Sequence, residues 1–242
     1  MAELPSGTVT FLFTDLEGST RLWEDHPEAM HGALARHDEI LRAAIAVHDG
    51  HVVKTTGDGV HAAFAEAPAA VLAARDAQLA LAAEPWAATG PLKVRMGVHT
   101  GHAEARDGDY YGSSVNRAAR LMSAANGGQV VVSLTTEELV RDELSDGVAL
   151  RDLGEQRLRD LSRPEHTYQL VAPGLEEAFA SLRSLDAYPS NLPQQVTSFV
   201  GRQREQAEIA QALESSRVVT VTGVGGVGKT RLATQVAADV LP

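Results

Sequence analysis

A nearly continuous run of β-branched, leucine and aromatic residues extends from Thr8 to Leu16 and gives way to acids at Asp15 and Glu17. Such a run is typical of a strand that is buried within a sheet. Carboxylates are rarely buried without a partner, so the acidic end should form a turn at the edge of that sheet. The segment therefore predicts a buried strand that ends in carboxylates.

Helical and strand patterns alternate after this run. Helices are expected from 19 onward and over 27–48, 68–83 and 114–125, and strands over 51–56, 60–66, 92–101, 129–133, 148–153 and 166–171. Ser19 or Thr20 is the expected cap of the first helix. The order predicts a mixed α/β (α+β) fold close to two β-α-β halves sharing one sheet: a ferredoxin-like β-α-β-β-α-β core with added C-terminal strands.

Composition excludes several classes of function. The 242 residues carry a formal net charge of −11, which disfavours direct binding to nucleic acid. The absence of cysteine removes disulfides, thiolate zinc sites and cysteine nucleophiles. No apolar stretch is long enough to span a bilayer, so no membrane partner is expected, and we interpret the chain as a cytoplasmic protein.

The character of the sequence changes after Val171. The stretch APGLEEAFASLRSLDAYPSNLPQQ contains several Pro and Ser and has weak periodicity. This composition predicts a linker over residues 173–195. The linker separates a first domain, residues 1–172, from a second segment, residues 196–242.

The second segment contains a glycine loop, GVGGVGKT, between the strand pattern RVVTVTG and the helical pattern RLATQVAADV. Gly223, Gly228, Lys229 and Thr230 match G-x-x-x-x-G-K-[ST], in which backbone N–H groups and the lysine hold phosphates and the threonine binds Mg²⁺. A glycine turn that merely joins strand to helix is the alternative. Residues 191–242 resemble the start of P-loop signal-transduction ATPases found in large bacterial transcription regulators. The resemblance implies a truncated start of such a domain, with little or no hydrolysis of its own.

Two acids in the first domain follow predicted strands. Asp15 lies in FTDLEG, and Asp58 lies at the tip of the predicted hairpin, in TTGDGV. If the two strands are neighbours, both carboxylates emerge at one end of the sheet and can bind hard divalent cations. Taken singly, Asp15 could cap the following helix and Asp58 could only shape the hairpin.

Four segments favour the cation site over the structural roles: TVTFLFTDLEGST, VVKTTGDGVHAAF, VRMGVHTG and DYYGSSVNRAARL. Their order and spacing resemble the class III nucleotide cyclase catalytic domain, over about residues 7–171. The resemblance implies a head-to-tail homodimer with its active sites at the interface. Each site takes metal-binding acids from one chain and base-reading and catalytic groups from the other.

The resemblance carries over residue by residue. Asp15 and Asp58 match the metal-binding aspartates, with the Leu16 carbonyl as a further ligand, for two divalent cations (Mg²⁺ or Mn²⁺) per active site. The implied reaction is attack of the ribose O3′ on the α-phosphorus of ATP, giving 3′,5′-cyclic AMP and pyrophosphate.

Lys54 and Asp109 match the positions that read the base. A lysine donor suits adenine N1 and a carboxylate acceptor suits the 6-amino group, whereas guanine reverses both requirements. Mismatched buried groups typically cost about 1 to 3 kcal/mol each, so the pair favours ATP over GTP. The alternative is an ordinary strand lysine and a turn aspartate.

Asn116 and Arg120 are four residues apart and share one face of a predicted helix. By resemblance, Asn116 orients the ribose and Arg120 stabilises charge at the α-phosphate, while Arg117 should be solvated. Arg95 matches a phosphate-contacting arginine, and Arg163 is a weaker candidate for the same work. His99 and His102 are expected to have surface or packing roles, and residues 102–108 should form a shorter dimer arm than in the longest family members.

The sequence therefore predicts an adenylate cyclase. A catalytically silent nucleotide-sensing module of a transcription regulator is the alternative. A diguanylate cyclase is set aside because TTGDGV lacks the Gly-Gly-acid-Glu-Phe signature of that family.

Overall fold

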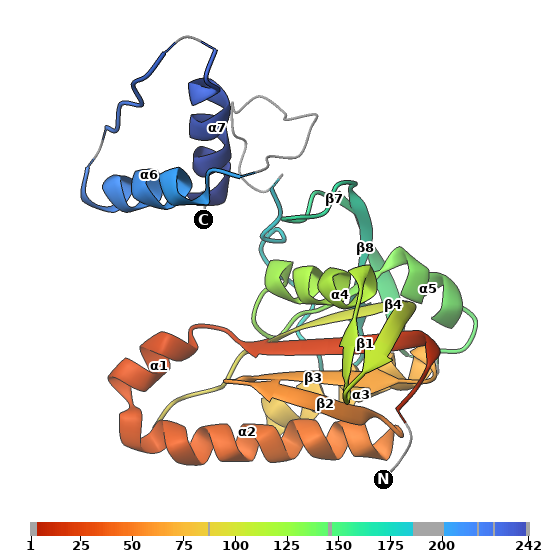
Figure 1. Cartoon of the computed structure of the whole chain (residues 1–242). Helices are drawn as coiled ribbons and strands as arrows, with labels where there is room; N and C mark the ends of the chain where they lie inside the picture. Colours follow the sequence, from red (N-terminus) through yellow and green to blue (C-terminus); the bar gives the residue numbers. More distant parts are fainter. Residues whose placement is uncertain are drawn as a thin grey trace. The chain divides into compact units, whose positions relative to one another are not determined.

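The computed structural model describes residues 4–86, 88–144, 147–185, 201–216, 218–224 and 226–240. The chain divides into two compact units, Met1–Ser184 and Leu185–Pro242. Figure 1 labels most of the helices and strands of each unit.

An eight-stranded mixed sheet forms the centre of the first unit (Figure 1). Its strand order is β2-β3-β1-β4-β6-β8-β7, and β5 pairs with β4. The first four strands are antiparallel neighbours in the order β2-β3-β1-β4, which is the predicted ferredoxin-like core. The strands are β1 (Gly7–Leu16), β2 (His51–Thr56), β3 (Gly59–Phe64), β4 (Val94–Arg106), β5 (Asp109–Tyr111), β6 (Val130–Ser133), β7 (Ala149–Gln156) and β8 (Glu165–Val171).

Helices cover both faces of this sheet. The helices are α1 (Ser19–Asp25), α2 (Pro27–Val47), α3 (Ala67–Ala83), α4 (Ser113–Ala124) and α5 (Leu134–Val140). The larger core joins α2 and α3 to Leu12 and Leu16 of β1. On the opposite face, which we call the α4 face, Val9 and Phe11 of β1 pack with Ala118 of α4. Alternate side chains of β1 therefore point to opposite faces of the sheet, as in any pleated strand.

Glycine brings β4 and α4 into close contact. A Cβ atom on Gly97 would lie 2.3 Å from the backbone nitrogen of Met122 and 2.6 Å from the carbonyl oxygen of Ala118. No side chain fits in this space, so the helix lies directly on the strand.

Most predicted elements of the first unit are confirmed, with four local corrections. Neither Ser19 nor Thr20 caps α1, because Ser19 is already helical and the capping position is Gly18, in the left-handed region at φ 70°. The short helix α5, capped by Ser133, was not predicted. Strand β4 extends past 101 to Arg106 and turns at residues 107–108 into β5, so the expected dimer arm is a β-hairpin.

The fourth correction concerns the predicted linker. Residues 173–184, which we call the strap, pack on the first unit instead of leading away from it. Leu182 is buried in the apolar cluster that contains Leu121 of α4 and Leu158. The Arg183 backbone N–H donates to the Ala124 carbonyl over 2.8 Å, and the Asn126 amide donates to the Ala180 carbonyl over 2.9 Å. Buried apolar contact at Leu182, hydrogen bonds and ion pairs to distant residues, such as Arg183 with Glu17, hold the strap, and none of these contacts leaves a periodic pattern in the sequence.

The second unit contains α6 (Gln203–Ser215) and α7 (Lys229–Val240). The strand predicted at RVVTVTG is wrong for its described residues, since 218–223 have no strand assignment and no partner strand exists in the described part of this unit. Residues 186–200, which include the rest of the predicted linker and the start of the predicted ATPase segment, lie outside the described residues. None of the helices that the structure describes is long and apolar enough to cross a membrane.

Two histidines are buried on the α4 face, His61 of β3 at 1% exposure and His99 of β4 at 2%. Burial is the main cause that lowers the pKa of each to about 4, and the positive charges of Lys54 and Arg117 add to the effect. The imidazole Nδ1 of His99 lies 2.7 Å from the Ser133 hydroxyl, which confirms the expected packing role. His102 is exposed.

Removing Leu182 should test the strap. Leu182→Ala should lower the free energy of unfolding by about 2 to 5 kcal/mol, because it empties a filled apolar site. Urea unfolding of the full chain measures the change. Leu139→Ala is the matched control, since Leu139 is 48% exposed and should cost less than about 0.5 kcal/mol. Equal effects of the two variants would show that the strap does not pack.

Mild acid should destabilise the first unit. An unfolded histidine takes up a proton below pH 6.5, whereas His61 and His99 stay neutral until about pH 4. The contribution of the two neutral histidines to the free energy of unfolding is therefore complete above pH 6.5 and decreases as the pH drops toward 4. At pH 5 the loss is about 2 kcal/mol per histidine. Urea unfolding at pH 7.5 and 5 measures this loss. His99→Gln should remove about half of it, and an unchanged pH dependence in that variant would contradict the assignment.

Candidate active site

Asp15 and Asp58 lie at the same end of two neighbouring strands. Strands β1 and β3 are antiparallel, with Phe13 opposite His61, and the Val60 N–H donates to the Thr14 hydroxyl over 2.9 Å. The β2–β3 turn, which contains Asp58, therefore lies against the end of β1, which contains Asp15. The condition set by the sequence, that the two strands be neighbours, is met.

The two carboxylates have different surroundings. Asp15 is opposite Arg95 in the β1–β4 ladder, and its Oδ2 accepts from Arg95 Nε at 2.7 Å and lies 2.6 Å from Arg95 Nη2. In contrast, Oδ2 of Asp58 is buried and has no hydrogen-bond partner in the described part of the chain. A buried carboxylate oxygen without a hydrogen-bond donor is costly, and coordination of a divalent cation by that oxygen removes the cost. The residues present therefore fit a cation.

These acids do not form a complete cage. No group of three His, Cys, Asp or Glu side chains among the described residues is arranged to hold a metal ion. A cation at Asp15 and Asp58 would need further oxygen ligands, such as the carbonyl of Leu16 and phosphate oxygens of a substrate. Asp15 does not cap α1, which has no side-chain cap.

Lys54 and Asp109 form an ion pair although 55 residues separate them in the chain. Lys54 is on β2, Asp109 begins β5, and Lys54 Nζ donates to Asp109 Oδ2 over 2.5 Å. This hydrogen bond is the main cause that lowers the pKa of Asp109, and the Tyr110 N–H contributes a second one. The side chains are 44% and 26% exposed, so a ligand can reach both.

Asn116 and Arg120 lie one turn apart on α4, as predicted. Arg120 Nη2 is 2.6 Å from Asp160 Oδ2, in the loop between β7 and β8. Arg117, which we expected to be solvated, is 38% exposed, but its Nε also lies 3.1 Å from Oε2 of Glu165 on β8, whose side chain is only 10% exposed. Arg163 is exposed in the β7–β8 loop.

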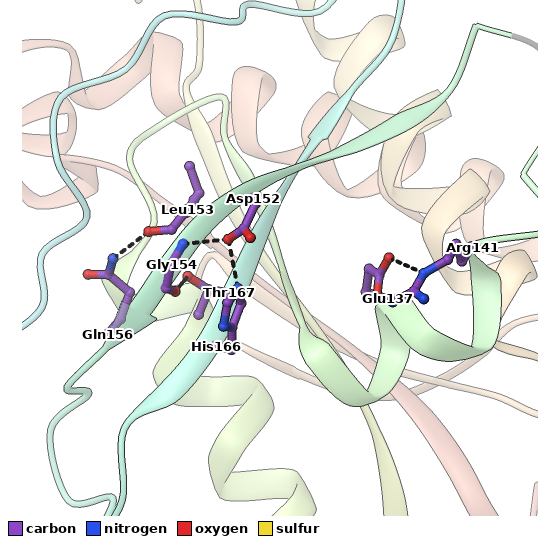
Figure 2. A network of polar contacts seen from close by, with 8 residues as sticks. All are labelled: Glu137, Arg141, Asp152, Leu153, Gly154, Gln156, His166 and Thr167. Carbon is purple, nitrogen blue, oxygen red and sulfur yellow. Dashed lines mark hydrogen bonds and ion pairs between the residues drawn. The ribbon is translucent and has the colours of Figure 1, made fainter.

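Figure 2 shows how the strands that flank this loop are fastened. The Asp152 carboxylate accepts from the Gly154 N–H and contacts His166 Nε2, each over 2.7 Å. Thr167 donates to the Gly154 carbonyl at the irregularity between residues 152 and 154 of the β7–β8 ladder. The base of the loop that contains Asp160 is therefore fixed by a polar network. Nothing in the sequence singled out Asp160, since one loop aspartate has no pattern.

The predicted phosphate loop lies in the second unit. Gly223 and Gly228 have positive φ angles, and Lys229 and Thr230 begin α7. Lys229 Nζ donates to the carbonyl oxygens of Gly223 and Val224, both over 2.9 Å. The lysine thus folds over the loop that precedes it.

Sequence relatives share most of the chain. A protein of Mycobacterium tuberculosis described as uncharacterized is 42% identical over 204 residues, which cover 83% of this chain and 69% of the relative. A receptor-type adenylate cyclase of Trypanosoma congolense is 35% identical over 217 residues, 72% of this chain but only 29% of the relative. The chain thus spans less than a third of that second relative.

A solved structure and a family model agree with these relatives. An adenylate cyclase from Trypanosoma brucei, determined in its monomeric state, matches with a TM-score of 0.67 and 31% identity, covering 75% of this chain and 95% of that one. Residues 1–172 match the model of the adenylate and guanylate cyclase catalytic domain. The chain therefore belongs to the family of adenylate and guanylate cyclase catalytic domains.

Proposed function

We propose that the first unit is an adenylate cyclase, which converts ATP into 3′,5′-cyclic AMP and pyrophosphate. The family includes both adenylate and guanylate cyclases. The observation that favours ATP is the Lys54–Asp109 pair, a donor beside an acceptor within 2.5 Å. Adenine N1 accepts from the lysine and the adenine amino group donates to the aspartate, whereas guanine offers a donor and an acceptor in the opposite order.

The reaction is an in-line displacement. The ribose O3′ loses its proton and forms a bond to the α-phosphorus, while the bond from that phosphorus to the bridging oxygen breaks and pyrophosphate leaves. Two divalent cations, Mg²⁺ or Mn²⁺, held by Asp15, Asp58 and the Leu16 carbonyl, would supply charge neutralisation for the phosphates and the attacking oxygen. Asn116 orients the ribose.

Arginines stabilise the negative charge of the triphosphate. Arg120 is assigned to the α-phosphate and Arg95 to the other phosphates. In the structure, Arg120 is paired with the Asp160 carboxylate and Arg95 with the Asp15 carboxylate. Binding of ATP therefore exchanges a carboxylate for a phosphate at each arginine. Asp15, once released by Arg95, would be free to hold a divalent cation, which would supply the positive charge beside it.

A homodimer completes the proposal. In a head-to-tail pair, Asp15 and Asp58 of one chain face the base-reading and catalytic side chains of the other, so each dimer contains two sites. The order and spacing of the four motif segments, which resemble class III nucleotide cyclases, support this arrangement.

A silent nucleotide sensor is the second candidate. The observation that favours it is the engagement of both Arg95 and Arg120 by carboxylates of the same chain. If these pairs persist in the presence of ATP, the nucleotide can bind through Lys54 and Asp109 without turnover.

For the second unit, we propose a nucleotide-phosphate site of a P-loop ATPase domain at Gly223, Gly228, Lys229 and Thr230. The positive φ angles of both glycines and the start of α7 at Lys229 support it. A helix N-terminus after such a loop is suited to phosphate.

Neutralising Asp58 should abolish the cyclase activity. Asp58→Asn removes one negative charge from the cation site and should lower cyclic AMP formation from ATP and Mn²⁺ at least about a hundredfold. Chromatography of the product measures it, with GTP in a parallel reaction. The control Asp25→Asn changes an acid that is 54% exposed and should keep full activity. Unchanged turnover in Asp58→Asn would contradict the two-cation site.

Mixing two inactive variants should restore activity if the site spans two chains. Asp58→Asn removes a cation ligand that one chain supplies, and Arg120→Ala removes a catalytic side chain that the other chain supplies. A heterodimer of the two keeps one intact site, so an equal mixture should reach about a quarter of the wild-type rate. Activity of the wild type should also rise faster than linearly with protein concentration when the dimer is weak. A mixture that stays inactive at every concentration would argue against shared sites.

A further inference from the structure

His61 is a buried residue whose ring packs in the fold but whose polar atoms are unpaired within the part of the chain that the structure describes. It lies on β3 at 1% exposure, and both of its ring nitrogens lack a hydrogen-bond partner among the residues that the structure describes. Buried polar atoms are nearly always paired, because an unpaired one loses its bonds to water and receives nothing in return. The other buried histidine of this face, His99, does have a partner in Ser133.

The strand register places His61 beside the base-reading lysine. His61 is opposite Lys54 in the β2–β3 ladder and opposite Phe13 in the β1–β3 ladder. Directly opposed residues point to the same face of a sheet, so all three side chains lie on the α4 face. The imidazole stacks on the Phe13 ring, with centroids 4.1 Å apart and planes at 28°.

Aromatic rings extend this contact to Asp109. Phe11 lies 5.7 Å from the His61 ring and meets Tyr110 edge-on at 5.1 Å. Tyr110 follows Asp109 directly and supplies it with a backbone hydrogen bond of 2.8 Å. The rings of Phe11, Phe13, His61 and Tyr110, which we call the aromatic floor, thus connect to both members of the Lys54–Asp109 pair.

Burial, with a smaller contribution from a nearby positive charge, determines the protonation state of His61. The pKa of the ring is lowered to about 4, first by burial and then by the positive charge of Lys54. The imidazole is therefore neutral at neutral pH and has one donor and one acceptor nitrogen. Lys54 has three ammonium protons, and Asp109 accepts one of them.

We infer that His61 is a positioning residue for base recognition: its free acceptor nitrogen takes a hydrogen bond from the Lys54 ammonium when a purine base separates Lys54 from Asp109. The inference rests on the proposed use of this pair to read adenine. When a base inserts between the two side chains, Lys54 loses Asp109 as its hydrogen-bond acceptor. The Lys54 ammonium must then be oriented toward adenine N1. His61 is buried on the same face, opposite Lys54, and neither of its ring nitrogens has a hydrogen-bond partner in the described part of the chain.

Substitution of His61 tests this role through nucleotide selectivity. His61→Phe keeps an aromatic ring over Phe13 and removes both nitrogens. It should raise the KM for ATP and lower the ratio of kcat/KM for ATP over GTP roughly tenfold, the effect of one hydrogen bond to a charged group, with little change in kcat. His61→Gln returns an amide acceptor and should recover most of the ratio. Should His61→Phe fail to fold, His61→Leu takes its place.

His99→Gln is the matched control, because it removes an equally buried histidine that already has a partner. It should lower the thermal midpoint and leave the ATP over GTP ratio unchanged. A ratio that stays at the wild-type value in His61→Phe, or that falls equally in His61→Gln, would overturn the inference.

Binding separates this inference from the proposed function. Calorimetric titration with ATP and GTP gives the ratio of dissociation constants even for a protein without turnover. A wild type that binds ATP more tightly than GTP but forms no cyclic AMP refutes the cyclase proposal and still tests His61, whose Phe variant should show the same loss of preference. Equal wild-type affinity for the two nucleotides overturns the inference.

Discussion

The position of β1 between β3 and β4 controls the rest of the first unit. Ten residues of β1 are paired with β4, and residues 10–13 are also paired with β3. Since side chains alternate along a strand, this register sends Leu12 and Leu16 into the larger core and Phe11, Phe13 and Asp15 to the α4 face. A slip of one residue would exchange the two sets and put a carboxylate into the apolar core. The burial of β1 thus fixes the place of its acid.

Charge pairing is the second organising feature of the α4 face. Three side chains assigned to nucleotide chemistry, Arg95, Lys54 and Arg120, each contact a carboxylate of the same chain, at 2.7 Å or less. Each pair is partly exposed, so solvent weakens it and a ligand can exchange with it at low cost. The exception is Asp58, whose buried Oδ2 has no donor among the residues that the structure describes. The face is therefore held together by pairs that substrate groups can replace, around one oxygen that favours a cation.

The strap connects the residues after β8 to these same elements. Arg183 forms an ion pair with Glu17, two residues after Asp15, and its backbone bonds to the end of α4. Leu182 packs beside Leu158 and near Leu161, which flank Asp160. A displacement of the strap would disturb the turn after β1, the helix of Arg120 and the loop of Asp160 together. The linker prediction assigned this segment no contact with the first domain, but it packs against the turn after β1, against α4 and against the residues around Asp160.

The sequence by itself determined the parts of this protein whose signal is local. The hydrophobic periodicity predicted the main strands and helices of the first unit, and the Asp-Gly and Gly-rich turns predicted their boundaries. The four motif segments indicated the family and the residues of the candidate site. Only the tertiary structure decided how these residues are paired. Arg95 with Asp15, Arg120 with Asp160, Arg117 with Glu165 and the strap with α4 all join residues distant in the chain, and a single charged or apolar side chain has no period that would reveal its partner. The isolation of His61 belongs to the same class, because a missing hydrogen bond depends on every group around it. Residues 218–223, the described part of the strand expected at RVVTVTG, form no strand for the complementary reason. Local propensity favours a strand there, but a strand forms only where another strand accepts its hydrogen bonds, and the described part of this unit contains none.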